Sequence, residues 1–417
     1  MAKTPNTNTS GTPYALYDLG AGAYPWSPVP PTPAIPVGSV SGLAAAISNA
    51  TQGDIIEIVS PGVYNIDTIV VGVPDITIRG HADAAPGDII LRGRGMDNAA
   101  HGGQVHGFYS EQAGLKLQNM TLEQFYQHAV TFGSGASRPI FEDLVIQDCG
   151  QQFIKASVWP SAINNGQVLG CTFRYTNGLP LTNQGAGYFY NGFLDIHSGA
   201  NWVVRGNVAQ EITPTQAEID ALPNGASYNA WTPAFYFWNG SSGTIIERNV
   251  FHNCARAVAL GLIDRMTAQD FNDHTGGIVK NNLIAIDAGR LSAAQTASSD
   301  GTILLWDAPG AKALHNTVLT NGQVADAVQG RWSLGLEIAN NLADNSIRMR
   351  DGAAYTGSNN VLSASPTWFV DPANADLRLN STGNSNVGTA ARLIDVLMDV
   401  DGTARNNPTK IGAHVYG

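Results

Sequence analysis

A short pattern recurs along most of this chain. It consists of two apolar positions separated by one variable residue, followed by an asparagine or aspartate and another apolar residue. Successive copies lie roughly 20 to 40 residues apart, a period typical of proteins that stack one structural unit on the next. The copies are "LKLQNMTL" around Asn119, "IFEDLVI" around Asp143, "WVVRGNV" around Asn207, "TIIERNVF" around Asn249, "GIVKNNLI" around Asn281 and Asn282, "KALHNTVL" around Asn316 and "LEIANNLA" around Asn340 and Asn341.

Further short β-prone runs lie between these copies, among them "AVTFG", "FIKAS", "FLDIH", "AFYFW" and "ILLWD". Two or three short strands per repeat, no helix between them and insertions of irregular length favour a β-solenoid. Propeller blades would have a more constant length and a fourth strand. In a solenoid each recurring asparagine lies above the previous one, so the amides can hydrogen-bond along the stack. We therefore expect Asn207 and Asn249 to be structural.

Composition supports an all-β fold and argues against one class of partner. The chain has 417 residues, of which 46 are glycine, 43% are hydrophobic and 13% are charged, which indicates a folded protein with many turns. A net charge of -11 without a lysine and arginine cluster argues against a nucleic-acid partner, although an anionic substrate is compatible with local potentials. Cys149, Cys171 and Cys254 follow strand-like runs, which favours buried thiols over disulfides.

The two ends of the pattern suggest one large domain with an appended arm. Residues 1–37 carry six prolines between Pro25 and Pro36, which predicts an extended arm lying on the body. The stretch "SGLAAAISNA", residues 41–50, predicts a short helix that covers the exposed end of the first coil. Residues 38–417 then form a single domain. We expect no membrane insertion, because no run of about 18 apolar residues exists.

Several features together resemble the right-handed parallel β-helix superfamily. They are the helix followed by "GDIIEIVSPGVY", the "ITIRG" strand, the asparagine bends and the closing "DVDGTARNNPTKIGAHVYG". The superfamily includes pectate lyases and chondroitinase-B-like and alginate-lyase-like bacterial proteins, and the resemblance covers about residues 38–417. It implies a polysaccharide groove along one sheet. It also implies an extracellular or periplasmic location, although "MAKTPNTNTSGTPY" has no hydrophobic signal core.

Strand alternation predicts which side chains would line such a groove. If Leu194 and Ile196 point inward, Asp195 and His197 point outward about 6 to 7 Å apart. The same reasoning leaves Tyr236, Trp238 and Lys155 outside on neighbouring strands. Stacked coil on coil, the expected row is Lys155, Asp195, His197, Tyr236, Trp238 and Arg256, with Trp306 or Asp307 beyond it.

Three long insertions would supply the walls of the groove: residues 176–191, 212–233 and 262–276. Loops of this length inside a compact domain are usually functional or disordered. Their aromatic residues suit sugar rings, and we expect Tyr188, Tyr190, Tyr228 and Trp231 to contribute. The polar residues of the third loop predict a solvated ion-pair network; they are Asp264, Arg265, Asp270, Asp273 and His274.

The favoured activity is β-elimination on an acidic, uronate-containing polysaccharide or oligosaccharide. Such a site needs a cation for the uronate carboxylate, a base and an acid. Lys155 or Arg256 would supply the cation, and His197, oriented by Asp195, would take the proton. Tyr188, Tyr190 or Tyr236 would protonate the leaving oxygen. The remaining aromatic residues would bind sugar, namely Trp231, Trp238 and Trp306.

Two other functions fit the same residues. A glycoside hydrolase would pair Asp195 with Glu211, Asp264 or Asp307 across the scissile bond. A non-catalytic tailspike-like β-helix would use the aromatic groove to bind carbohydrate or a receptor without proton transfer. A calcium ion is compatible with the oxygens that line such coils, although no loop has the ligand spacing of a recognised calcium motif. No other cofactor is expected, and the oligomeric state stays open.

Overall fold

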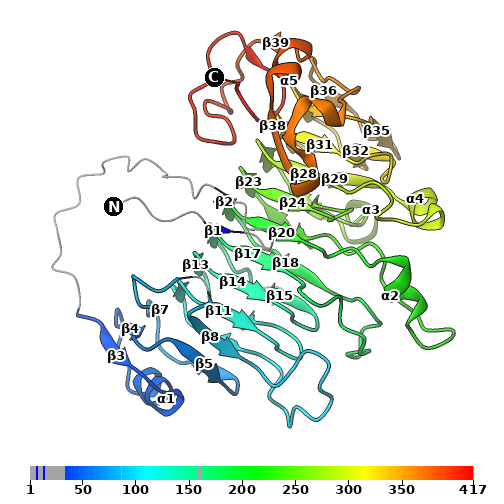
Figure 1. The fold of residues 1–417 in the computed structure, drawn as a ribbon. Coiled ribbons are helices and arrows are strands. Elements are labelled where there is room, and N and C mark those ends of the chain that lie inside the picture. Colours follow the sequence, from blue (N-terminus) through cyan, green and yellow to red (C-terminus); the bar gives the residue numbers. More distant parts are fainter. Residues whose placement is uncertain (1–5, 8–12, 15–32, 86, 158–160, 417) are drawn as a thin grey trace.

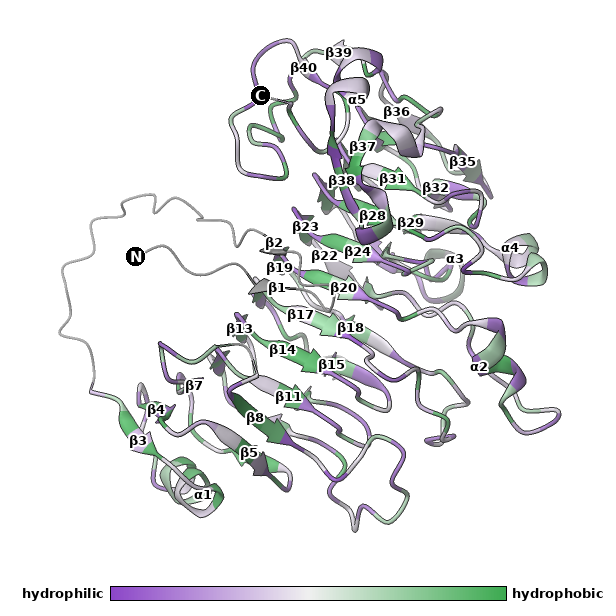
Figure 2. Ribbon diagram, viewed as in Figure 1, coloured by the Kyte–Doolittle hydropathy of each residue, from purple (hydrophilic) through white to green (hydrophobic). Residues whose placement is uncertain are grey.

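The computed structural model describes residues 6–7, 13–14, 33–85, 87–157 and 161–416. The chain winds into a right-handed parallel β-helix (Figure 1), which confirms the predicted fold. Three parallel sheets run along its length and contain 12, 10 and 10 strands within the described residues. Each coil contributes one short strand to each sheet, and side chains from all three sheets fill one continuous core. Hydrophobic residues concentrate on strands such as β8 and β14, whereas the connecting loops are largely hydrophilic (Figure 2).

The first sheet, called sheet 1, begins before the capping helix and ends after the last full coil. Its strands are β3 (Ile35–Val37), β4 (Ile55–Ile58), β7 (Thr77–Gly80), β10 (Lys116–Gln118), β13 (Ile140–Glu142), β16 (Gln167–Leu169), β19 (Val203–Arg205), β23 (Ile245–Glu247), β27 (Ile278–Lys280), β30 (Lys312–Leu314), β33 (Leu336–Ala339) and β36 (Tyr355–Thr356).

Sheet 2 follows sheet 1 after a tight bend in most coils. Its strands are β5 (Gly62–Asn65), β8 (Ile89–Arg92), β11 (Thr121–Glu123), β14 (Val145–Gln147), β17 (Thr172–Arg174), β20 (Val208–Gln210), β24 (Val250–His252), β28 (Leu283–Ala285), β31 (Thr317–Leu319) and β34 (Leu342–Ala343).

Sheet 3 follows sheet 2 after loops of very different length. Its strands are β6 (Ile69–Val71), β9 (Phe108–Ser110), β12 (Val130–Phe132), β15 (Gln152–Ala156), β18 (Gly192–His197), β21 (Phe235–Trp238), β25 (Val258–Leu260), β29 (Gly301–Trp306), β32 (Asp326–Arg331) and β35 (Ser346–Arg350). The short elements in the loops are α2 (Gln216–Asp220), β22 (Ser241–Ser242), α3 (Met266–Gln269), β26 (His274–Thr275) and α4 (Ala293–Ser298).

The tight bend between sheets 1 and 2 contains the predicted asparagine stack. Each amide Nδ2 donates to the Oδ1 of the asparagine on the next coil at 2.9 to 3.0 Å. Every asparagine of this ladder except the last is buried, so these hydrogen bonds satisfy amides that have no access to bulk water. The ladder consists of Asn207, Asn249, Asn282, Asn316, Asn341 and Asn360.

The asparagines and aspartates of the repeated sequence pattern occupy two different positions of this bend. Asn119 and Asp143 occupy the position before the ladder, where the backbone φ is 56° and 53°. Such left-handed backbone favours asparagine, aspartate and glycine. In these early coils the ladder position itself holds the buried Met120 and Leu144. The asparagine stack therefore begins at Asn207, later along the chain than the pattern suggested.

The N-terminal end of the core is covered by helix α1 (Val40–Ser48), with Leu43 and Ile47 packed into the core. Its N-cap is Ser39, whose hydroxyl accepts from the Gly42 amide, so the helix begins slightly before the predicted residues 41–50. Strand β3 lies within the predicted arm and pairs with β4. Of the remaining arm, β1 (Asn6–Thr7) pairs with β2 (Pro13–Tyr14), and residues 1–5, 8–12 and 15–32 lie outside the described residues.

The C-terminal segment leaves the helix after β36 and packs across the outside of sheet 2 (Figure 1). Leu377 and Leu379 join a second apolar cluster with Val250, Leu283 and Leu319 of sheet 2. The elements of this segment are η1 (Pro366–Trp368), β37 (Phe369–Asp371), η2 (Pro372–Asn374), β38 (Asp376–Leu379), α5 (Ser381–Asn386), β39 (Thr389–Ala390) and β40 (Thr409–Lys410).

The three cysteines are buried as free thiols, as predicted. Within the described ranges, no helix is long and apolar enough to cross a membrane.

Candidate functional site

The outer face of sheet 3 brings most of the predicted row together. Lys155 on β15 is in register with Asp195 on β18, which is in register with Tyr236 on β21. His197 is likewise in register with Trp238. The alternate side chains lie in the core, as alternation predicted; they are Ile154, Leu194, Ile196, Phe235 and Phe237.

The Asp195 carboxylate is the centre of this group, with 0% of its surface exposed. Its Oδ2 lies 2.6 Å from Lys155 Nζ, and its Oδ1 accepts a hydrogen bond from Trp238 Nε1 at 2.9 Å. Burial raises the pKa of Asp195, but the neighbouring His197 and the charge of Lys155 outweigh that effect and hold this pKa below its usual range. Asp195 is therefore an ionised carboxylate without access to solvent.

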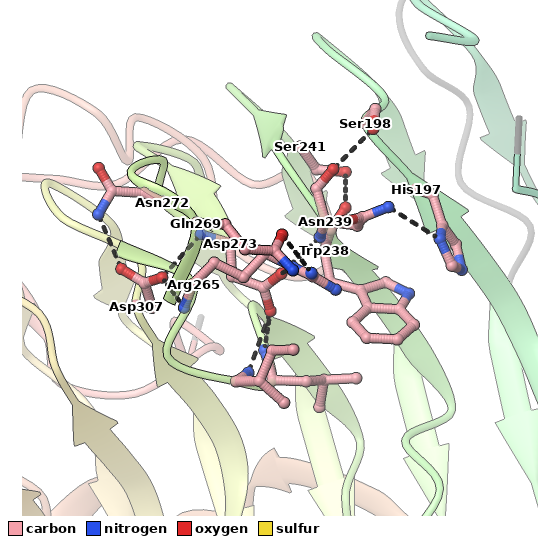
Figure 3. Close-up of polar contacts among 12 residues, drawn as sticks. His197, Ser198, Trp238, Asn239, Ser241, Arg265, Gln269, Asn272, Asp273 and Asp307 are labelled. Carbon is pink, nitrogen blue, oxygen red and sulfur yellow. Dashed lines mark hydrogen bonds and ion pairs between the residues drawn. The ribbon is translucent and has the colours of Figure 1, made fainter. Parts of the chain in front are cut away.

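The His197 imidazole lies between Asp195 and Asn239. Its Nε2 is 3.1 Å from Asp195 Oδ1, an ion-pair distance without the alignment of a hydrogen bond. On the other side, Asn239 Nδ2 lies 3.3 Å from His197 Nδ1 (Figure 3). With the amide in this orientation Asn239 can only donate, so Nδ1 carries the lone pair and Nε2 carries the proton. The imidazole side chain remains 17% exposed.

Lys155 is the cation of the group, and its side chain is 16% exposed. Its Nζ also lies 3.3 Å from Gln152 Oε1 and 5.5 Å from the centre of the Tyr190 ring. Tyr190 comes from the loop of residues 176–191, immediately before β18. The loop therefore brings a half-buried phenol to the predicted cation.

The Tyr236 hydroxyl is buried in the same group and has no hydrogen-bond partner among the described residues. The side chain lies over Gly192, where an added Cβ would be 2.7 Å from Tyr236 Cε1. Gly192 is thus required by this close approach. Burial raises the pKa of Tyr236 well above 10.0, so the phenol stays protonated.

Other predicted binding residues lie outside this group. Arg256 forms an ion pair with Asp300 and donates to the carbonyl oxygen of Trp231 at 2.7 Å. Trp231 packs in a separate apolar cluster with Ala255, and Trp306 is only 6% exposed. The predicted row is corrected accordingly: the position beyond Tyr236 belongs to Ala259, and Arg256 lies before β25, outside the row.

Tyr188 differs from its neighbour Tyr190. It packs against the main core, and its backbone pairs with Tyr228, so the loops of residues 176–191 and 212–233 lie side by side. These two loops form one wall next to β18 and β21. Periodicity could not distinguish the two tyrosines, because neither belongs to a strand.

The loop of residues 262–276 was predicted to carry a solvated ion-pair network; an ion pair between Arg265 and Asp273 is present, but it is buried instead of solvated. Arg265, Asp273 and His274 are buried. Asp273 Oδ1 accepts from Arg265 Nε at 2.5 Å and from the backbone N–H of Asn239 at 2.6 Å. The Arg265 guanidinium lies 5.3 Å from the Trp238 ring (Figure 3). The loop therefore packs on the indole of Trp238. It is also linked to His197, because Asn239 contacts both Asp273 and the imidazole.

The site also contains two residues that no sequence pattern selected. Asn239 holds the Nδ1 side of the imidazole, and Gln152 contacts Lys155. Asn239 adopts a left-handed backbone with φ of 56°, so a bend asparagine directly after a strand was the one available signal.

On this face, the described residues include no group of three His, Cys, Asp or Glu side chains close enough to share a metal ion. Among the described residues, Asp399, Asp401 and His414 are close enough to share an ion, but they belong to the C-terminal segment. Asp399 accepts from three backbone amides, and His414 Nδ1 accepts from the Leu379 amide. These hydrogen bonds account for the group, and we assign it no metal.

No family model matches the chain, and no curated protein matches its sequence. Among solved structures, it is similar to an alginate lyase from Paenibacillus sp. str. FPU-7, with 14% identity and a TM-score of 0.41 over 79% of this chain and 94% of that chain. It is also similar to pectate lyase Pel9A, with 12% identity and a TM-score of 0.45 over 91% and 89% of the two chains. A GH136 lacto-N-biosidase from Eubacterium ramulus gives 11% identity and a TM-score of 0.43 over 78% and 64%. Likeness at this level concerns the fold and carries no argument about activity.

Proposed function

We propose that the protein is a polysaccharide lyase that cleaves a uronate-containing polymer by β-elimination. One observation supports this most strongly: a single buried carboxylate, Asp195, contacts both the cation Lys155 and the imidazole His197 on one outward face. The cation and the base are thereby held in fixed positions beside each other, which is the arrangement that elimination next to a carboxylate requires.

In the proposed reaction, Lys155 pairs with the uronate carboxylate and stabilises the charge that develops when the adjacent carbon loses its proton. The Nδ1 atom of His197 accepts that proton, and the 3.3 Å contact from Asn239 must open to expose the lone pair. The electrons of the broken C–H bond form the new C=C bond, and the C–O bond to the leaving sugar breaks. Tyr190 donates its phenolic proton to the departing oxygen.

Asp195 is a positioning residue in this proposal, because its carboxylate is buried and cannot reach the substrate. Its negative charge keeps the His197 proton on Nε2 and stabilises the imidazolium that forms when Nδ1 accepts a second proton. Trp238 restrains the same carboxylate through its indole N–H and packs edge to face against His197 at 4.6 Å.

The carboxylates considered for a glycoside hydrolase are less suited to that reaction, which needs two accessible carboxyl groups across the bond. Asp195 belongs to each pair considered, including the pair with Asp264, and its oxygens are engaged by Lys155, Trp238 and His197. Asp307 is buried and accepts from backbone amides of the loop of residues 262–276. Glu211 pairs with Arg290 at 3.0 Å. These engagements favour the lyase.

A polymer of this kind does not cross a cell membrane, so we also propose that the protein acts outside the cytoplasmic membrane. The test is incubation with alginate, pectate, chondroitin and neutral glycans, following ultraviolet absorbance and reducing ends together. Absorbance from an unsaturated uronate supports the proposal. Reducing ends without absorbance would indicate a hydrolase. The absence of both signals with all of these glycans would indicate a non-catalytic binding protein.

A further inference from the structure

The outer face of sheet 3 differs on the two sides of Asp195. Toward the N-terminal coils, Thr131 on β12 and Tyr109 on β9 continue the register row and are partly exposed. Toward the C-terminal coils, the same row continues through Ala259 on β25 and Leu304 on β29, and both are fully buried. The face is therefore open on one side of the proposed catalytic group and covered on the other.

The cover is built from side chains of several coils. Tyr236, Ala259, Leu304 and Trp306 form an apolar cluster on this outer face, with Leu262 and Trp238 packed against it. Trp306 lies between two guanidinium groups, with Arg256 at 5.5 Å and Arg331 at 4.8 Å from its ring. A substrate cannot lie on the sheet here without displacing this layer.

The loop of residues 262–276 closes the border next to Trp238. Two buried carboxylates fix it: Asp273 accepts from the Leu262 amide at 2.6 Å, and Asp307 accepts from the Arg265 amide at 2.8 Å. Figure 3 shows Trp238 between His197 on one side and Arg265 on the other. Opening the loop would leave buried charges without partners, which is strongly unfavourable. The barrier is thus a fixed part of the fold.

We propose, on the basis of the lyase function argued above, that this enzyme acts on chain ends. The polymer lies over β15, β12 and β9, and its terminal residue stops at the barrier of Trp238 and Arg265. At a strand spacing of about 4.8 Å, these three strands span on the order of 10 Å, which suits a short oligosaccharide. The products are short fragments released one after another from one end.

The chemistry of the open side limits how far the tight contacts extend. Tyr109 donates to Glu111 at 2.5 Å, and Glu111 is exposed. Its carboxylate repels a uronate carboxylate at this coil, so the strongest contacts fall over β12 and β15. Beyond β12 the bound polysaccharide can leave the surface, because Thr131 and Tyr109 are only partly covered by other described residues.

The first test is the size distribution of products from a long uronate polymer at low conversion. We expect one short product from the first time point, with the remaining polymer nearly unchanged in length. A ladder of intermediate sizes with an early fall in viscosity would overturn the proposal.

The second test does not depend on turnover. The His197→Ala variant is titrated by calorimetry with uronate polymers of equal mass concentration but tenfold different length. Binding to chain ends predicts about tenfold fewer sites per unit mass for the longer polymer. An equal number of sites, or no binding to either polymer, would contradict it. End-limited binding by the wild type without any unsaturated product would retain the chain-end proposal and reject the lyase.

Two matched variants locate the bound chain. Thr131→Trp places an indole on the open row, and we expect at least a tenfold loss of oligosaccharide affinity. Val70→Trp lies on the same row beyond Tyr109, where the residue is 63% exposed, and should bind as the wild type does. Equal affinities for the two variants would show that the chain does not follow this row.

Discussion

Lys155 Nζ lies 2.6 Å from Asp195 Oδ2, and the two residues differ in their access to solvent. The carboxylate is completely buried, whereas the lysine side chain keeps 16% of its surface exposed. Removing either partner therefore has a different consequence. A lysine that loses Asp195 can turn toward water, but an aspartate that loses Lys155 remains a buried charge.

The first prediction compares Lys155→Met with Asp195→Asn by urea unfolding. We expect a loss of about 3 to 5 kcal/mol for the lysine variant and about 1 to 3 kcal/mol for the aspartate variant. The double variant should regain part of the loss. Lys116→Met, which breaks a more exposed pair with Glu142, serves as control with a change of about 0 to 1 kcal/mol. Equal losses of unfolding free energy in the two single variants would contradict the idea that the burial of Asp195 makes Lys155 the more costly partner to remove.

The second prediction concerns Asn239 as a positioning residue. Asn239→Ala removes the donor to His197 Nδ1, a hydrogen bond worth about 0.5 to 1.5 kcal/mol. This contact holds the imidazole in the tautomer with the proton on Nε2 and the lone pair on Nδ1, so its loss should lower kcat about 2-fold to 10-fold, more than release of Nδ1 raises it. We expect KM to stay nearly unchanged and the nitrogen-15 shifts of the imidazole to report a change of tautomer population. Asn201→Ala is the control, because Asn201 is exposed and has the same left-handed backbone. An unchanged tautomer signal in Asn239→Ala would exclude this role.

The third prediction concerns the asparagine ladder. Asn249 accepts from both the backbone and side-chain nitrogens of Asn207 and donates to Asn282. Asn207 lies at the end of the ladder, where its Oδ1 accepts from the Cys171 amide. Asn249→Ala should therefore lower the unfolding free energy by about 2 to 4 kcal/mol, because it leaves several buried groups unpaired. Asn207→Ala should lower it by less, and neither should change kcat per folded molecule. A larger loss of unfolding free energy in Asn207→Ala than in Asn249→Ala would contradict this role of the ladder.

The fourth prediction is acid destabilisation by buried histidines. Burial lowers the pKa of His128, His274 and His315 to about 3 each. Between the unfolded value near 6.5 and about pH 3, the unfolded state binds more protons, so stability falls as the pH falls. Each histidine contributes on the order of 1 kcal/mol per pH unit in this window.

The measurement is urea unfolding of His274→Gln at pH 7 and pH 5. The variant should lose less stability than the wild type between these two values, whereas His81→Gln at a more exposed position should behave as the wild type. The contribution of Asp195 is a separate effect. Its pKa is lowered, so its stabilisation is complete above about pH 4 and disappears only in stronger acid. An identical pH dependence in His274→Gln and the wild type would reject this explanation.

The fold was predictable because the repeat is local. Asn207 and Asn249 recur at a bend, and the alternation around Leu194 and Ile196 correctly assigned Asp195 and His197 to the outer face. The same alternation does not predict which residues cover that outer face. Whether Trp306 is open or buried depends on Arg256, Arg331 and a loop whose conformation no strand periodicity encodes.

The ion-pair partners of the charged residues were the second feature that could not be predicted from the sequence. Arg256 was predicted to be a cation for the substrate, but it forms an ion pair with Asp300, which is distant in the sequence. Asn239 could not be selected because its role depends on the orientation of one imidazole. Contacts between coils depend on insertion lengths, and a single sequence does not determine how insertions fold back on the sheet.

The most direct test of the central claim is the mass of the product released from a uronate polymer by the wild-type protein. β-Elimination predicts an unsaturated oligosaccharide lighter by one water than the corresponding hydrolysis product, and His197→Ala should abolish it while remaining folded. A saturated product carrying the elements of water, or undiminished formation of the unsaturated product by His197→Ala, would contradict the account.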